Sequence, residues 1–136
     1  MHKSGEDYLE AVLAIEEEDG VVRTTDVANR LGLSKPSVSR AMKNLMEGGY
    51  VVRPSYGDIK LTEKGRAIAA QVYYRHKMLT EFLRDVLGVN GETAEHDACL
   101  IEHDISEETL TKLSAYLHSL QNNVERSETT KSLHNT

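Results

Sequence analysis

The stretch TTDVANRLGLSKPSVSRAMKNLMEGGYVVRPSYGDIKL, residues 24–61, decides the fold of the first half of the chain. Apolar residues recur at helical spacing on both sides of Gly32, which ends the first of two predicted helices. Ser34 is a suitable N-cap for the second helix, Pro36 is tolerated in its first turn, and Gly48 ends it. Two short helices joined by a tight turn that contains glycine are typical of a helix-turn-helix.

Two short β-type runs come directly after these helices. Residues 50–53 are rich in valine, residues 54–58 carry turn-forming residues, and residues 59–61 make a second strand. A helix-turn-helix followed at once by a small hairpin indicates a winged helix, a fold that reads DNA with its second helix.

The charge of the chain is unevenly distributed. The 136 residues carry a net charge of −6, which by itself argues against nucleic-acid binding. From residue 20 to residue 66, however, nine basic and four acidic residues give +5, whereas residues 71–136 give −5. This distribution suggests that the basic segment meets phosphate, as in double-stranded DNA, and that the rest of the chain has another role.

The residues expected to contact DNA lie on the outer face of the second helix or on the wing. Small hydroxyl residues allow close approach, and arginine and lysine reach base edges or phosphates. An ordinary amphipathic hairpin would also carry polar outer residues, and the following wing favours DNA binding over that alternative. The predicted contacts are Ser34, Lys35, Ser37, Ser39, Arg40, Lys43, Arg53 and Lys60.

The rest of the chain is predicted to be helical. Apolar spacing indicates helices over residues 6–19, 63–87 and 92–104, then a helix capped by Ser106 whose polar tail, from about residue 122, is expected to be mostly disordered. The architecture is therefore mainly α: an N-terminal winged helix-turn-helix with a small β-hairpin wing in residues 1–70, and an all-helical domain in residues 71–136. Apolar residues make up only 39% of the chain, which favours pairing with a second copy as a homodimer.

The pentapeptide Cys99-Leu100-Ile101-Glu102-His103 carries the clearest chemistry. On a helix, Cys99, Glu102 and His103 share a face and offer a thiolate, a carboxylate and an imidazole, which suits a divalent transition metal. Chance also produces such triplets. On periodicity alone, Asp7 and Glu10 are part of a solvated acidic edge, and His76 is an ordinary helix histidine.

Two further features bear on the compartment. No stretch approaches the roughly 18 uninterrupted apolar residues of a membrane span, and the N-terminus has no apolar signal core. Cys99 is the only cysteine, so we expect a reducing, cytoplasmic environment in which it stays a thiol. Neither a membrane nor an organic substrate is expected as a partner.

Four pieces, in order, resemble the diphtheria toxin repressor family: the start Gly5-Glu6-Asp7-Tyr8-Leu9-Glu10, the winged helix, Tyr74-Arg75-His76, and Glu102-His103. Within it the sequence is most similar to the short manganese transport regulators. The resemblance spans residues 5–120 and implies a homodimeric, metal-activated repressor of metal-uptake genes, with a dimerisation role for the helical domain. It also implies the metal ligands Asp7, Glu10, His76, Glu102 and His103, with Cys99 at a sixth ligand position.

The implied site is mixed in character. Asp7 and Glu10 match the manganese branch of the family, whereas Cys99 matches the iron branch, which has a thiol at that position. Hard oxygen ligands suit Mn²⁺, and a thiolate favours Fe²⁺, Co²⁺ or Zn²⁺. Mn²⁺ is the expected cofactor and Fe²⁺ its rival. His96 precedes Cys99 by three residues and is a further candidate for a place near the site.

Three hypotheses of function follow from these observations. The first is a metal-dependent transcriptional repressor, with an iron-dependent repressor as its variant. The second is a winged-helix regulator that senses a small organic ligand and binds DNA without metal. The third is a small di-metal hydrolase, which needs an open coordination position beside a substrate pocket. Because half of the chain is committed to DNA, we expect a regulator and not an enzyme.

Overall fold

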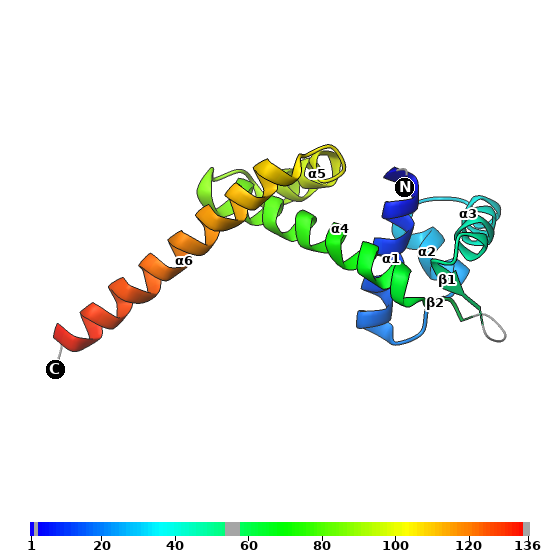
Figure 1. Cartoon of the computed structure of the whole chain (residues 1–136), viewed down its shortest axis with the longest axis horizontal. Helices are drawn as coiled ribbons and strands as arrows, with labels where there is room; N and C mark the ends of the chain where they lie inside the picture. Colours follow the sequence, from blue (N-terminus) through cyan, green and yellow to red (C-terminus); the bar gives the residue numbers. More distant parts are fainter. Residues whose placement is uncertain (2, 54–57, 135–136) are drawn as a thin grey trace. The chain divides into compact units, whose positions relative to one another are not determined.

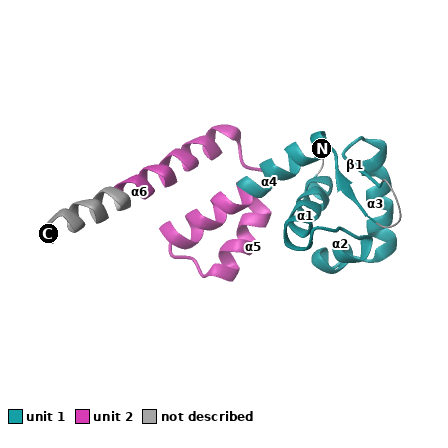
Figure 2. Cartoon of the chain, turned by 90° about the horizontal axis from the view of Figure 1, so that it is seen from below, with its two compact units in different colours: residues 1–74 teal, residues 75–136 magenta. Residues whose placement is uncertain are grey.

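The computed structural model describes residues 1, 3–53 and 58–134, with side chains described as far as residue 123 (Figure 1). The chain divides into two compact units, Met1–Tyr74 and Arg75–Thr136 (Figure 2). It is mainly helical with one small sheet, as the sequence predicts. Of the turn expected at residues 54–58, residues 54–57 lie outside the described residues.

The first unit is a winged helix. It contains α1 (Lys3–Asp19), α2 (Thr24–Leu31) and α3 (Lys35–Glu47), followed by β1 (Val51–Val52) and β2 (Lys60–Leu61). The strands pair antiparallel, with Val51 opposite Leu61 and Val52 opposite Lys60. Apolar side chains from all three helices and both strands form one core, in which the fully buried members include Leu9, Val12, Val27, Val38, Met42 and Val51.

Local hydrogen bonds fix the ends of the two helices of the helix-turn-helix. Ser34 is the N-cap of α3, and its Oγ accepts the Ser37 N–H at 3.3 Å, as predicted. Gly32 ends α2 with φ +66°, a left-handed conformation that glycine adopts without strain. Arg23 is the N-cap of α2, and its backbone N–H donates to Asp26 Oδ2 at 3.0 Å.

The start of α4 (Glu63–Glu81) is tied tightly to the loop before β1. The Thr62 N–H donates to Tyr50 O at 3.0 Å, and Thr62 Oγ1 donates to Gly49 O at 2.7 Å and accepts the Gly65 N–H at 3.1 Å. The backbones are so close that a Cβ on Gly65 would lie 1.9 Å from Tyr50 O. Position 65 therefore requires glycine.

The second unit contains the end of α4, a π-helical turn η1 (Phe82–Val86), α5 (Gly91–Ile101) and α6 (Glu107–His134). Asn90 caps α5 through its side chain, and Ser106 Oγ accepts the Thr109 N–H at the start of α6. Two contacts join α4 and η1 to α6. Arg75 forms an ion pair with Glu107 at 2.8 Å, and Phe82 meets Tyr116 edge to face with 6.5 Å between ring centres.

The helices of this unit differ from the expected ones in three places. The helix predicted over residues 63–87 is α-helical only to Glu81, because the Leu87 N–H bonds to Phe82 O, five residues back. The helix predicted over residues 92–104 ends at Ile101, with Glu102 as its C-cap. The polar tail is helical as far as His134, and no glycine or proline, the residues that disfavour a helix most, follows Gly91.

None of the helices in the described part of the chain combines the length and apolar character that crossing a bilayer requires.

Candidate metal centre and nucleic-acid interface

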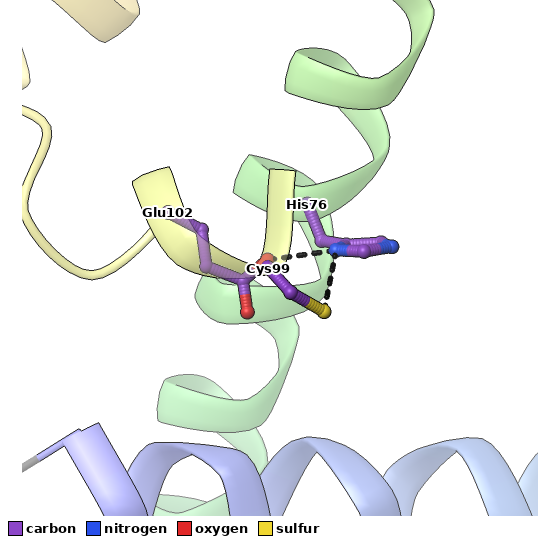
Figure 3. A group of neighbouring side chains, drawn as sticks. All are labelled: His76, Cys99 and Glu102. Atoms are coloured by element: carbon purple, nitrogen blue, oxygen red, sulfur yellow. Dashed lines mark hydrogen bonds and ion pairs between the residues drawn. The ribbon is translucent and has the colours of Figure 1, made fainter. Parts of the chain in front are cut away.

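Helices α4 and α5 bring three potential metal donors together within the second unit. His76 Nδ1 lies 2.8 Å from Glu102 Oε2 and 3.7 Å from Cys99 Sγ (Figure 3). One donor atom from each side chain lies within 4.8 Å of the other two. The structure therefore joins two residues of the predicted pentapeptide to His76, which periodicity alone left as an ordinary histidine.

Glu102 is the central residue of this group. Glu102 is only 1% exposed although it carries a carboxylate. Its Oε2 lies 2.8 Å from His76 Nδ1. Its Oε1 lies 3.3 Å from His103 Nε2, at ion-pair distance, but accepts no hydrogen bond from the described residues. A buried carboxylate oxygen without a hydrogen bond is energetically unfavourable. A divalent cation beside it would remove that penalty, so the residues fit a metal.

The three donors differ in exposure and in chemistry. Glu102 is buried, the His76 side chain is 16% exposed, and Cys99 is exposed. Nitrogen, sulfur and oxygen donors together suit a borderline transition metal and are a poor set for Mg²⁺ or Ca²⁺. Thr80 Oγ1 donates to His76 O at 2.8 Å and so links the backbone at His76 to the next turn of α4.

The structure also identifies one neighbour that the sequence reasoning missed. Glu95 Oε1 lies 4.0 Å from His76 Nε2, the ring nitrogen that does not face Cys99 and Glu102. His96, the candidate named from the sequence, is exposed and does not belong to the group formed by His76, Cys99 and Glu102. A signal was available, because Glu95 lies four residues before Cys99 and so shares its helix face.

The remaining predicted ligands are placed as follows. His103 lies just after α5, with a side chain only 3% exposed. Asp7 and Glu10 are half-buried residues on α1, in the first unit. Their participation in the metal site stays a prediction.

The predicted DNA contacts on α3 form an exposed face. The six DNA contacts predicted on α3 and its N-cap are all exposed: Ser34, Lys35, Ser37, Ser39, Arg40 and Lys43. Ser34 also serves as the helix cap, and its hydroxyl donates to Ser37 Oγ at 2.8 Å. The apolar residues of α3, such as Val38 and Met42, face the core, so the basic side chains are left available to a ligand.

The wing residues differ in their local contacts. Lys60 is exposed on β2. Arg53 is exposed, and its Nη2 donates to Thr24 Oγ1 at 2.6 Å, at the start of α2. The guanidinium is thereby held beside the N-terminus of a helix whose dipole also favours phosphate.

A winged helix with an exposed basic reading helix, linked to a helical unit with a three-donor group, defines the class of metal-binding transcriptional regulators. Two family models match the chain: the N-terminal DNA-binding domain of iron-dependent repressors over residues 1–59, and their metal-binding and dimerisation domain over residues 62–130. The chain belongs to the diphtheria toxin repressor family of metal-dependent transcriptional repressors. It is a regulator and not an enzyme, as the sequence predicts.

Curated relatives match along nearly the whole chain. An uncharacterised helix-turn-helix transcriptional regulator of Methanocaldococcus jannaschii is 36% identical over 91% of this chain and 100% of its own length. The transcriptional regulator MntR of Geobacillus thermodenitrificans is 33% identical over 96% of this chain and 92% of its own. MntR of Bacillus subtilis is 31% identical over 96% of this chain and 91% of its own length.

Solved structures give the same result for the fold. A manganese-dependent transcriptional repressor in complex with manganese has a TM-score of 0.77 and 29% identity, with 84% of this chain and 52% of that chain covered. The metal-dependent transcriptional regulator MtsR has a TM-score of 0.78 and 29% identity, with 87% of this chain and 55% of that chain covered. The chain thus spans about half the length of these two solved proteins.

Proposed function

We propose that the chain is a manganese-responsive repressor that binds operator DNA as a homodimer and controls metal-uptake genes in the cytoplasm. The observation that carries the proposal is the meeting of His76, Cys99 and Glu102, in which one oxygen of the buried Glu102 carboxylate accepts no hydrogen bond from the described residues. It occurs in a chain that also has a DNA-binding domain and a dimerisation domain.

The full ligand set that we propose adds Asp7, Glu10 and His103 to these three residues. Six such donors bring several negative charges together, so repulsion between like charges disfavours assembly of the site without metal. A bound divalent metal supplies the positive charge that offsets this repulsion. Glu102 is suited to the central place, because its two oxygens face different histidines, His76 and His103.

The ligands come from three helices in the proposed mechanism. His76 presents Nδ1 from α4, and Cys99 presents its thiol from α5. Asp7 and Glu10 add carboxylates from α1, which belongs to the DNA-binding unit, so ligation gives that unit a preferred attachment to the helical unit. The exposed α3 residues then contact the major groove, with Arg53 and Lys60 on the neighbouring backbone.

The choice between manganese and iron depends on Cys99. Relatives named MntR and a solved repressor described as manganese-dependent support Mn²⁺. A thiolate at the site raises the affinity for Fe²⁺, Co²⁺ or Zn²⁺ relative to an all-oxygen and nitrogen set. We propose Mn²⁺ as the resident metal and Fe²⁺ as the competitor.

DNA-binding anisotropy with labelled promoter DNA tests this function. Mn²⁺ and Fe²⁺ are titrated separately, without oxygen, against a chelator control. A preference of about 100-fold of the metal for the DNA-binding form corresponds to roughly 2.7 kcal/mol. We expect Mn²⁺ to tighten DNA binding and Glu102→Ala to abolish the response. Equal binding in chelator and in metal would instead indicate the regulator that senses an organic ligand.

A further inference from the structure

We propose that Glu95 is a positioning residue of the metal centre, whose carboxylate holds the outer ring nitrogen of His76 while the inner nitrogen binds metal. This inference rests on the proposed function, because it takes His76 as a ligand. It adds a residue outside the ligand set that the sequence resemblance implies.

The placement of Glu95 follows from the geometry of α5. Glu95, Cys99 and Glu102 are separated by four and three residues, so they form one stripe along the helix. All three lie against the same imidazole ring of α4. Glu102 and Cys99 face Nδ1 at 2.8 and 3.7 Å, and Glu95 faces Nε2 at 4.0 Å.

The chemistry of a histidine ligand gives this arrangement its meaning. A neutral imidazole that binds metal through Nδ1 carries its proton on Nε2. A carboxylate that accepts this N–H fixes the orientation of the ring and increases the electron density at the metal-binding nitrogen. The Glu95 side chain is 71% exposed, so it has the rotamer freedom to shorten an ion-pair distance of 4.0 Å to a hydrogen bond.

Two alternative roles for Glu95 are less well supported. The two ring nitrogens point in different directions, so a metal held by Nδ1, Cys99 and Glu102 lies on the opposite side of the ring from Glu95. A separate metal on Nε2 would need at least one more donor. Among the side chains that the structure describes, no group of three potential ligands includes Glu95.

Metal affinity, measured by competition with a fluorescent Mn²⁺ chelator, is the first test. We compare the native chain with Glu95→Ala, Glu95→Gln, Glu92→Ala and Glu102→Ala. Glu92 is an exposed carboxylate on the same helix, so its variant controls for the loss of one negative charge. Outer carboxylates of this kind typically contribute 10- to 100-fold in metal affinity, and for an exposed one we expect about tenfold in Glu95→Ala.

The other variants define the mechanism. Glu95→Gln should lose less affinity than Glu95→Ala, because its amide oxygen still accepts the Nε2–H. Glu92→Ala should stay within about twofold of the native chain, as expected for an exposed charge. Equal affinities for Glu95→Ala and Glu92→Ala would overturn the positioning role.

The absorption spectrum of the Co²⁺-loaded chain is the second readout, since it reports the ligands themselves. At saturating Co²⁺, Glu95→Ala should keep the native d–d bands and the sulfur-to-cobalt band of Cys99. Altered d–d bands would make Glu95 a ligand and overturn the proposal. A lower melting temperature of metal-free Glu95→Ala, relative to Glu92→Ala, would assign Glu95 a structural role and also overturn it.

The same series separates this inference from the proposed function. If the native chain binds no Mn²⁺, or if Glu102→Ala binds it equally well, the metal centre itself is wrong and the role of Glu95 falls with it. If the native chain binds Mn²⁺ and Glu102→Ala does not, while Glu95→Ala equals Glu92→Ala, only the role of Glu95 is wrong.

Discussion

Replacement of Glu102 by glutamine should affect the metal-free and the metal-loaded protein in opposite directions. The carboxylate is 1% exposed, and its Oε1 accepts no hydrogen bond from the described residues. Glutamine keeps the shape and removes the charge, and its amide can donate to His76 Nδ1 in place of the present 2.8 Å contact. Because glutamine removes a buried negative charge, whose burial costs free energy, we expect metal-free Glu102→Gln to be more stable than the native chain by roughly 1–2 kcal/mol.

The metal response of the same variant should disappear. A ligand at 100 times its dissociation constant stabilises the folded state by about 2.7 kcal/mol. For a chain of this size, 1 kcal/mol shifts the melting temperature by roughly 2–4 °C, so Mn²⁺ should raise that of the native chain by about 5–11 °C. Glu102→Gln should show almost no shift, because a neutral amide oxygen is a weak ligand for the metal.

Thermal unfolding followed by circular dichroism, in chelator and in Mn²⁺, measures both effects. Asp104→Asn is the matched control, because Asp104 is an exposed acid two residues away. It should leave the metal-induced shift intact. An undiminished shift in Glu102→Gln would show that Glu102 is not a ligand. A metal-free variant clearly less stable than the native chain would refute the claim that the buried carboxylate is unfavourable.

Three further predictions concern the DNA-binding unit. Gly65→Ala should destabilise it by several kcal/mol, because the added Cβ meets Tyr50 O at 1.9 Å; chemical denaturation measures the change, and a loss within ~0.5 kcal/mol would contradict the tight packing. Ser34→Ala should lower the free energy of unfolding by about 1 kcal/mol through loss of the cap, whereas Ser34→Asp should largely retain it. Arg40→Ala and Lys43→Ala should each weaken operator binding; if the contact is to phosphate, the salt dependence falls by about one counterion per variant, and unchanged affinity in both would remove α3 from the interface.

The winged helix could be predicted from the sequence because its signals are local. Gly32, Ser34 and Gly48 determine where helices begin and end through backbone conformation and caps that involve neighbouring residues only. The alternating strands and the turn residues between them are equally local. Tertiary contacts then had little freedom to shift these boundaries.

The second unit was harder to predict because its boundaries depend on contacts between distant residues. Nothing in the apolar spacing of residues 63–87 distinguishes the π-helical turn at Phe82, whose ring packs on Tyr116 of α6. The tail was expected to be mostly disordered from its polar composition, but the helix extends to His134 through a segment without glycine or proline, the two residues least compatible with a helix. The polar composition of the tail indicates that its side chains are not buried, and this does not exclude a helix.

The candidate site could be predicted only in part for the same reason. The spacing of Cys99 and Glu102 shows that both lie on one side of a helix, and it carries no information about which histidine lies opposite. His76 entered the predicted site through family resemblance. Glu95 was missed because its partner is 19 positions away in the sequence and only the packing of α4 on α5 brings them within 4.0 Å.

The exposure of Cys99 has a practical consequence for any measurement on this protein. Of the three grouped donors it is the one that air reaches first, and oxidation to a sulfenic or sulfinic acid replaces a soft sulfur donor by hard oxygens. The metal preference of an oxidised sample would then differ from that of a fresh one. The added oxygen atoms change the mass by only a few tens of daltons, so the difference is easily overlooked. A thiol assay recorded with every metal titration would show whether Cys99 was reduced or oxidised in that sample.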